Sequence, residues 1–227
     1  MATKQQIKSK TRVADHGEVF TNEREVNAML DLVKHETERL DSRFLEPACG
    51  DGNFLIAILD RKMKIVKEKS KGDNYIFKKN TMIAVSSIYG VELLDDNAKE
   101  CRSRLFEFIY DIYKKIEHKD DDMFLSSIKY LLTTNIICGD ALTLKDNNKK
   151  PLTFAEWGFH GDLVSRRDFT LSTLLEAESY RINEKENEGQ LSLFDNDDVW
   201  DEVYESVCQP IKIYPSIHFL KVGEAYE

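Results

Sequence analysis

The fold is decided by the stretch Arg43-Phe44-Leu45-Glu46-Pro47-Ala48-Cys49-Gly50-Asp51-Gly52-Asn53-Phe54-Leu55. Its first four residues predict a short strand that ends at Pro47, and the next residues form a glycine-rich turn. A helix is expected from about Asn53, because apolar residues recur at helical spacing over 54–59. A strand, a glycine turn and a helix in this order indicate an α/β fold.

The flanking sequence continues this alternation of strands and helices. Upstream, helical spacing of apolar residues predicts a helix over about 23–40, and the Thr21 hydroxyl is expected to cap its first turn. Residues 67–80 are polar and lysine-rich, and we interpret them as an insertion. Downstream, strands are predicted at residues 88–93, 135–138 and 152–157, and helices at 95–116 and 123–132. This order predicts a mostly parallel sheet with helices on both faces.

The chain length and the distribution of charge predict the domain organisation. The 227 residues suffice for one domain, which we expect over 23–175, after an N-terminal arm over 1–22 and before an acidic C-terminal extension over 176–227. Eleven acidic and two basic residues lie within 176–205, so this segment alone carries the net charge of −9 and reads as a solvated surface or a loose segment. Acidic bulk charge disfavours a protein that grips duplex DNA by itself.

Cysteine spacing and hydropathy indicate the compartment. No apolar run approaches the roughly 20 residues of a membrane span, and the first residues lack the apolar core of a signal peptide. We therefore expect a cytoplasmic protein with no membrane association. The four cysteines are widely spaced and none belongs to a Cys-x-x-Cys pair, which predicts reduced thiols and no metal site.

The glycine turn is the first candidate ligand site. In a parallel sheet, ligands bind beyond the carboxyl ends of the strands, and glycines let the backbone approach them. A dinucleotide fingerprint requires a third glycine where Leu55 stands, and the Gly-Lys-Ser/Thr sequence of a phosphate-binding loop is absent. Nicotinamide and nucleoside-triphosphate sites are therefore disfavoured, and a tight turn without a ligand is the alternative.

Two acidic residues follow the predicted strands. Glu92 ends the second strand and can accept hydrogen bonds from both hydroxyls of a ribose, or it can cap the next helix. Asp140 follows the third strand and can accept a hydrogen bond from an adenine amino group, or it can cap a turn.

These motifs resemble those of one family. Residues 46–55 closely resemble the S-adenosylmethionine (SAM) motif of adenine-specific DNA methyltransferases from restriction–modification systems. Residues 17–21 resemble the segment that precedes this motif and contacts the methionine part of SAM, although Asn22 stands where the family has proline. Residues 90–92 and 139–141 resemble the second and third motifs, so the resemblance covers about residues 12–142.

The resemblance implies a Rossmann-like SAM-dependent methyltransferase fold, SAM as cofactor, and DNA methylation. The order of the motifs matches the methylating subunits of type I systems and related fused enzymes. DNA would be the partner, bound by this chain or through a partner protein of a restriction–modification assembly. The cofactor-binding residues that it implies are Phe20, Thr21, Glu46, Pro47, Ala48, Gly50, Gly52, Asn53, Phe54, Glu92, Leu93, Asp140 and Ala141.

The resemblance ends before the catalytic motif. The family places Asn-Pro-Pro-Tyr after the next strand, where it holds the target amino group and stacks on the flipped base. No such tetrapeptide occurs here, and the corresponding residues are 154–157. Glu156 could accept from an amino group and Trp157 could stack on a base, or both are strand and core residues. About 70 residues follow, too few and too acidic for the family's DNA-recognition domain.

Three functions are therefore open. The first is an adenine-specific DNA methyltransferase-like protein of a restriction–modification or phage-defence system. The second is a catalytically inactive SAM-binding subunit or paralogue that regulates or assembles with such a system. The third, a fold that has lost its ligand, is disfavoured because the glycine and ribose motifs are intact.

Overall fold

A three-stranded parallel sheet lies at the centre of the computed structural model, which describes residues 9–16, 19, 21–117, 119–176 and 208–225. The strand order is β1-β2-β3, with β1 at Phe44–Glu46, β2 at Ile88–Glu92 and β3 at Ile136–Cys138. Glu46 is in register with Gly90, and Glu92 with Cys138, so the three carboxyl ends meet at one edge. The predicted parallel α/β arrangement is confirmed for these strands.

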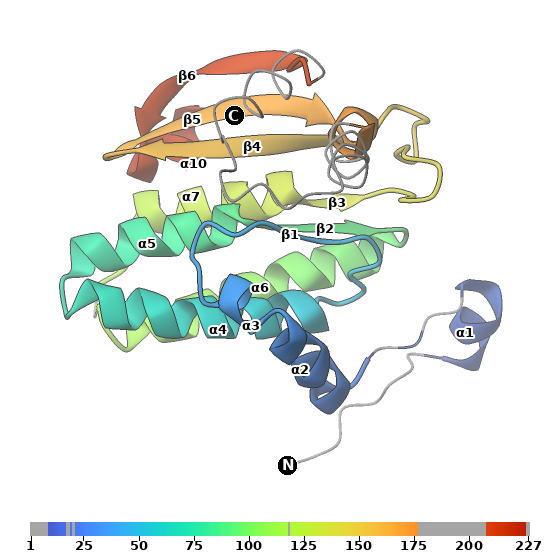
Figure 1. Ribbon diagram of the computed structural model, residues 1–227, viewed down its shortest axis with the longest axis horizontal. Coiled ribbons are helices and arrows are strands. Elements are labelled where there is room, and N and C mark those ends of the chain that lie inside the picture. Colours follow the sequence, from blue (N-terminus) through green and yellow to red (C-terminus); the bar gives the residue numbers. More distant parts are fainter. Residues whose placement is uncertain (1–8, 17–18, 20, 118, 177–207, 226–227) are drawn as a thin grey trace, which may run out of the picture.

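Helices cover the parallel sheet, as Figure 1 shows. The helices from residue 10 to residue 135 are α1 (Lys10–His16), α2 (Glu23–Leu32), α3 (Lys34–Thr37), α4 (Asn53–Ser70), α5 (Asn74–Ser86), α6 (Asp95–Lys114) and α7 (Asp122–Asn135). Of these, α1 lies apart from the sheet in Figure 1. All five residues of β2 are buried, because α4, α5, α6 and α7 all pack against this strand. None of the described helices combines the length and the apolar character that a membrane span requires.

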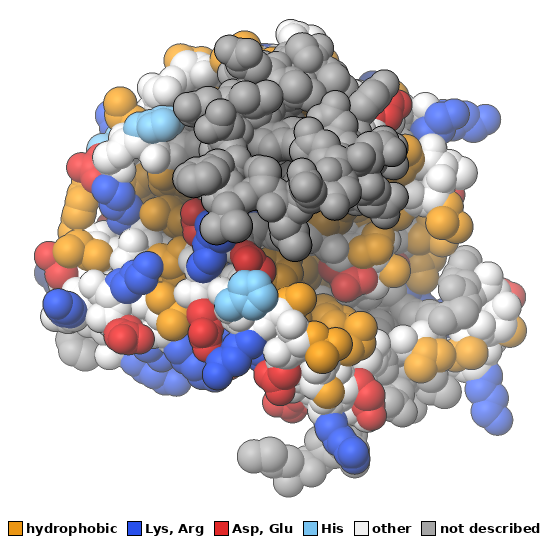
Figure 2. Space-filling model, viewed as in Figure 1, with side chains coloured by type: hydrophobic (Ala, Val, Ile, Leu, Met, Phe, Trp, Pro, Cys, Tyr) orange, Lys and Arg blue, Asp and Glu red, His pale blue; other side chains and the backbone are white. Residues whose placement is uncertain are grey.

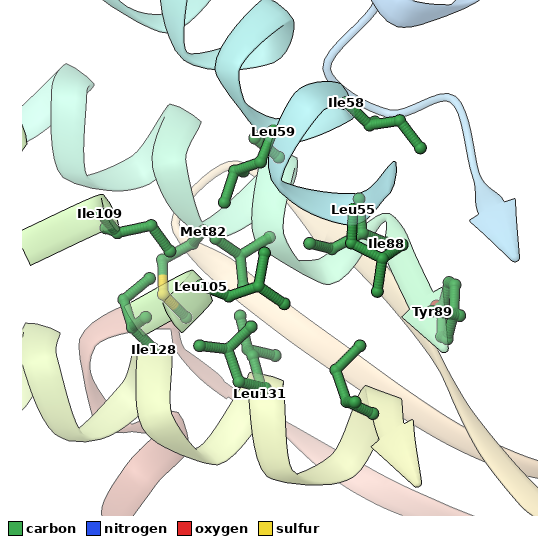
Figure 3. Close-up of a cluster of buried hydrophobic side chains, with 14 of the residues drawn as sticks. Leu55, Ile58, Leu59, Met82, Ile88, Tyr89, Leu105, Ile109, Ile128 and Leu131 are labelled. Carbon is green, nitrogen blue, oxygen red and sulfur yellow. The ribbon is translucent and has the colours of Figure 1, made fainter. Parts of the chain in front are cut away.

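The core lies where these four helices converge on β2. Leu55 and Leu59 of α4, Met82 of α5, Leu105 of α6 and Leu131 of α7 are fully buried and point toward one another in Figure 3. Burial of such side chains stabilises a fold by roughly 1.5–3 kcal/mol each. In α4 and α6, the apolar residues at helical spacing therefore form the buried face of each helix.

Residues 67–80, which we interpreted as an insertion, span the end of α4, a turn and the start of α5. Helix α4 continues to Ser70, a left-handed turn follows at Lys71, and the Asp73 side chain caps α5 by accepting from the backbone N–H groups of Tyr75 and Ile76. Lys67, Lys69 and Lys71 are exposed, whereas Lys78 pairs with Asp121 at 2.8 Å and Lys79 with Asp162 at 3.0 Å. The lysine-rich composition is therefore compatible with helix formation.

The upstream helix begins and ends differently from the prediction. Asn22 caps α2, since its Oδ1 accepts from the backbone N–H of Arg24 at 2.9 Å and of Glu25 at 3.3 Å. Thr21 is therefore not the cap. The predicted helix over 23–40 is interrupted at Val33, whose ψ of 32° separates α2 from α3.

The predicted fourth strand forms, but in a different sheet. β4 (Thr153–His160) pairs antiparallel with β5 (Leu163–Thr170), and β5 pairs antiparallel with β6 (Lys212–His218). Gly161, with φ of 61°, opens a two-residue hairpin turn that brings β5 back alongside β4. The expectation of one mostly parallel sheet is therefore correct only for β1, β2 and β3.

The end of the chain packs on the same core. After the 3-10 helix η1 (Phe219–Lys221), helix α10 (Val222–Ala225) lies against α7, and the side chains of Phe219 and Val222 are fully buried. Residues 212–225 thus form β6 and the helical turns that follow it. The acidic segment 176–205 falls outside the described residues after Glu176, so the domain boundary there stays a prediction.

A buried lysine connects α4 to the chain before β1 and β2. Lys62 is completely buried, and its Nζ donates to the carbonyls of Leu40 at 3.0 Å and Ser42 at 2.6 Å and to the Ser87 hydroxyl at 2.7 Å. Loss of hydration lowers the pKa of Lys62 to about 7. The Lys62 side chain therefore holds α4 against the residues that precede β1 and β2.

Lys62 predicts a pH dependence of stability. An unfolded lysine has a pKa of about 10.4, so between that value and about 7 the unfolded chain binds a proton that the folded chain does not. The free energy of unfolding should therefore rise with pH across this window, by up to about 5 kcal/mol. Urea unfolding of the natural chain and of Lys62→Met at a series of pH values measures it. Parallel profiles for the two proteins would contradict the prediction.

Candidate functional site

The site lies at the edge where the three parallel strands end. β1 is followed directly by the turn 47–52, β2 by Leu93, and β3 by Gly139. The backbone N–H of Cys49 donates to Val91 O at 2.9 Å, and that of Gly139 donates to Glu92 O at 2.9 Å. The segments after all three strands are thus held side by side around the end of β2.

The glycine turn requires its two glycines. Gly50 has φ of 53° and Gly52 has φ of 93°, the left-handed region that favours glycine. A Cβ on Gly52 would lie 2.7 Å from Cys101 Sγ, so the turn packs directly on α6. The nearby Cys101 thiol, together with burial, raises the pKa of the Cys49 thiol, which therefore stays neutral and packs as a small apolar group.

Glu92 joins the glycine turn to the start of α6. Its side chain is 7% exposed; Oε2 accepts from Gly50 N–H at 2.8 Å and Oε1 accepts from Leu94 N–H at 3.0 Å. The amide of Asn97 also approaches Oε1, at 3.4 Å. Each carboxylate oxygen has two lone pairs, so Glu92 combines a helix-capping bond with remaining capacity to accept from a ligand.

A second carboxylate of the turn is paired with an arginine that the sequence did not single out. Asp51 is buried, and Arg104 of α6 reaches its Oδ2 at 2.7 Å and its carbonyl at 2.5 Å. Arg104 also donates to Asn53 Oδ1 at 3.1 Å. A buried carboxylate is stabilised by a neighbouring cation, and the packing of α6 on the turn shows that Arg104 is this cation.

The upstream segment reaches the same edge. Asn53 Nδ2 donates to Thr21 O at 3.1 Å, which places the end of this segment beside the first turn of α4. Helix α1 is held at the start of α6 by Arg12, whose guanidinium contacts both carboxylate oxygens of Asp96 at 2.6 and 3.2 Å. Phe20, an expected cofactor contact, lies outside the described residues.

The remaining residues from the first two motifs lie around the turn. Glu46 is half-buried and accepts from Ala48 N–H at 3.4 Å, and burial raises the pKa of its carboxyl group. Pro47 and Ala48 are exposed, Phe54 is half-buried beside the core, and Leu93 is 50% exposed. The turn therefore presents backbone and small side chains to the outside of this edge.

Asp140 has the geometry of a turn cap. Its carboxylate accepts from Leu142 N–H at 2.8 Å and from the Thr143 hydroxyl at 2.9 Å and N–H at 3.4 Å. The bond from Leu142 N–H lowers the pKa of Asp140 most, so the group is ionised at the site edge. Ala141 follows it and is half-buried against the core.

Glu156 and Trp157 lie in β4 and have the environment of strand and core residues. Glu156 forms ion pairs with Arg43 at 2.8 Å and Arg167 at 2.6 Å. Trp157 is 7% exposed, and its Nε1 donates to Asn135 Oδ1 at 2.9 Å. In this arrangement neither side chain offers a free surface for stacking on a base.

Comparison with known proteins identifies the kind of domain. The family described as "MmeI, DNA-methyltransferase domain" matches residues 17–158, more than half of the chain. A Methanocaldococcus jannaschii protein, provisionally named type II restriction enzyme and methyltransferase RM.MjaORFECS2P, is 25% identical over 143 residues. These residues are 61% of this chain but only 12% of that relative. No solved structure matches the chain.

The Asp51–Arg104 pair predicts a stability effect at the site. Arg104→Met removes the cation that pairs with a buried carboxylate, and should lower the free energy of unfolding by about 2–4 kcal/mol. The matched control is Lys99→Met on the same helix, because the Lys99–Asp95 pair is exposed and is expected to contribute about 0.3–0.5 kcal/mol. Chemical denaturation compares the two variants, and equal small losses would show that the Asp51–Arg104 pair does not stabilise the turn.

Proposed function

The chain belongs to the MmeI DNA-methyltransferase domain family, which is of restriction–modification type, and on this premise we propose that it binds SAM at the turn 47–52. The observation that carries the proposal is the position of Glu92, held at the end of β2 between the N–H groups of Gly50 and Leu94. A carboxylate fixed beside a glycine turn is suited to the vicinal hydroxyls of a ribose.

The residues at this edge fit the chemistry of SAM. Glu92 Oε2 accepts only from Gly50 N–H, so it retains a lone pair for a ribose hydroxyl, and the absence of a side chain at Gly50 lets a ligand lie against the backbone. SAM carries a sulfonium and an ammonium group, both positive. The carboxylates of Glu46, Glu92 and Asp140, at the ends of three adjacent strands, favour such a cation by charge attraction.

The upstream segment would complete the pocket. The carbonyl of Thr21 accepts from Asn53 Nδ2 at the first turn of α4, so Thr21 lies beside the helix that follows the glycine turn. Leu93 and Ala141 stand directly after the two acidic motif positions and supply apolar contact at the same edge. SAM, when bound, supplies a methyl group on sulfur that a nucleophilic amino nitrogen can accept.

The acceptor that we propose is the exocyclic amino group of adenine in DNA, within a restriction–modification or phage-defence system. The basis is the resemblance of residues 46–55 and 17–21 to the adenine-specific enzymes, together with the family match. An adenine must leave the base stack and be held in line with the methyl group. In β4, Glu156 is bound by two arginines and Trp157 is buried, so neither is positioned for that task.

We therefore propose a division of labour. This chain supplies the cofactor site, and the residues that hold the base come from elsewhere, in a partner protein or a longer polypeptide. The size of the relative supports this proposal, since the chain spans only 12% of its length.

A titration with SAM tests the cofactor site. Glu92→Ala should raise the Kd by roughly 10- to 100-fold, because hydrogen bonds to a charged group contribute about 1.5–3 kcal/mol. Glu107→Ala, an exposed acid on α6, is the matched control and should leave the Kd unchanged. Unaltered affinity in a folded Glu92→Ala protein would remove Glu92 from the site.

A ligand-side experiment separates ribose recognition from any effect of Glu92 on folding. An S-adenosylhomocysteine analogue without the 2′-hydroxyl should bind the natural chain more weakly than the parent compound. In Glu92→Ala the two ligands should bind equally, because the acceptor of that hydroxyl is gone. An undiminished difference in the variant would show that another residue binds the ribose.

The purified chain is expected to methylate DNA poorly or not at all. Incorporation of tritiated methyl groups into mixed-sequence DNA measures this, and addition of the neighbouring gene products should restore it. Robust, sequence-specific adenine methylation by the purified chain, abolished by Trp157→Ala, would instead show that residues 154–157 are a working variant of the missing motif.

A further inference from the structure

A basic loop follows β3 at the same edge as the proposed cofactor site. We define it as residues 142–151, which include Lys145, Lys149 and Lys150 and the single acid Asp146. Figure 1 shows the segment between β3 and β4 extending beyond the carboxyl ends of the parallel strands. The chain carries a net charge of −9, so the positive charge of this loop is opposite in sign to that of the whole protein.

The basic loop has a defined conformation. Asp140 and Lys145 exchange two backbone hydrogen bonds, of 2.9 and 3.3 Å, and Leu152 N–H donates to Leu144 O at 2.9 Å. At the tip, Asp146 N–H donates to Lys150 O at 2.8 Å. A loop closed by this ladder presents its side chains at fixed positions, which lowers the entropy lost when they contact a ligand.

Asn147, in the turn at the tip of the basic loop, connects the loop to the end of β3. Asn147 Nδ2 reaches Cys138 Sγ at 3.6 Å, and Cys138 Sγ in turn lies 3.6 Å from Leu93 O. Cys138 is the register partner of Glu92 across the sheet. The loop is therefore connected through two contacts to the residues that follow Glu92.

The three lysines are exposed and available. None of them forms an ion pair with a residue in the described part of the chain, whereas Lys64 and Lys99 on the helices pair with acids four residues away. The carboxylate of Asp146 is used within the loop, because Oδ1 accepts from the N–H groups of Asn148 and Lys150, both at 2.8 Å. The positive charge of the loop is thus directed to solvent.

We propose that Lys145, Lys149 and Lys150 bind the phosphate backbone of duplex DNA beside the cofactor edge, an inference that rests on the proposed function. A base extruded toward the site keeps its backbone at this edge, and cations there replace the counterions of the phosphates. Contacts of this kind position the duplex without reading its sequence. They also offset the repulsion between DNA and an acidic chain.

The experiment compares two triple variants that each remove three positive charges. In the loop variant, Lys145, Lys149 and Lys150 become Gln. In the control variant, Lys67, Lys69 and Lys71, exposed at the far end of α4, become Gln. Both triples include one lysine in the left-handed region, Lys149 with φ of 63° and Lys71 with φ of 47°, so the backbone cost is matched.

The control lysines are far from the proposed contact. Helix α4 starts at the glycine turn and its 18 residues extend about 27 Å away from it. Basic side chains also gather on the described surface over α4 and α5, at the lower left of Figure 2, so the control removes charge from a region that is itself basic. A general effect of net charge would therefore appear equally in both variants.

Affinity for a fluorescently labelled mixed-sequence duplex is measured by anisotropy over a series of NaCl concentrations, for the natural chain and both variants, with SAM present. Three lost phosphate contacts should reduce the slope of log K against log salt by about 2.7 and weaken binding at low salt by about tenfold or more. The control variant should keep the natural slope. Thermal melting verifies that all three proteins are folded.

The outcomes separate the loop from the proposed function. Equal slopes for the two variants, or a natural chain that binds no duplex at low salt, would overturn the assignment of the loop. Calorimetric titration of the same proteins with SAM tests the proposed function independently, because the three lysines lie outside the glycine turn. SAM binding with unchanged salt slopes would reject the loop alone, and absent SAM binding would reject the cofactor site.

Discussion

The bond from Gly50 N–H to the Glu92 carboxylate is the constraint on which the site depends. It joins the turn after β1 to the end of β2, and it holds Gly50 in a left-handed conformation that few other residues adopt. The second oxygen of Glu92 reaches Leu94, so the start of α6 is fixed by the same side chain. The positions of turn, strand end and helix are therefore coupled through one buried carboxylate.

Other buried polar groups hold the elements that carry this carboxylate. Arg104 connects α6 to the turn through Asp51, and Lys62 connects α4 to the chain before β1 and β2. Each ionised group is hydrogen-bonded to groups that would otherwise be desolvated without a partner, which is the condition under which buried charge is tolerated. The apolar core packs the helices, while these bonds determine how they are oriented at the site.

Residues 154–157, which stand where the family has its catalytic motif, lie in the antiparallel sheet. After the basic loop, the chain passes into β4 and turns back at Gly161, so β4 pairs with β5. Trp157 is thereby directed at Asn135 in the interior. The chain thus contains the part of a restriction–modification methyltransferase domain that resembles a cofactor site. In the described structure, Glu156 and Trp157 of β4 are not positioned to hold a base.

The sequence by itself determined the elements whose signals are local. The strand, glycine turn and helix at 43–59 and the acid that ends β2 follow from spacing and residue type. The polar composition of residues 67–80 did not reveal that this stretch contains the end of α4 and the start of α5. Only the tertiary structure decided the sheet that β4 joins and the partners of Asp51 and Lys62. Those choices depend on contacts between segments far apart in the chain, for which a single sequence contains no periodic signal.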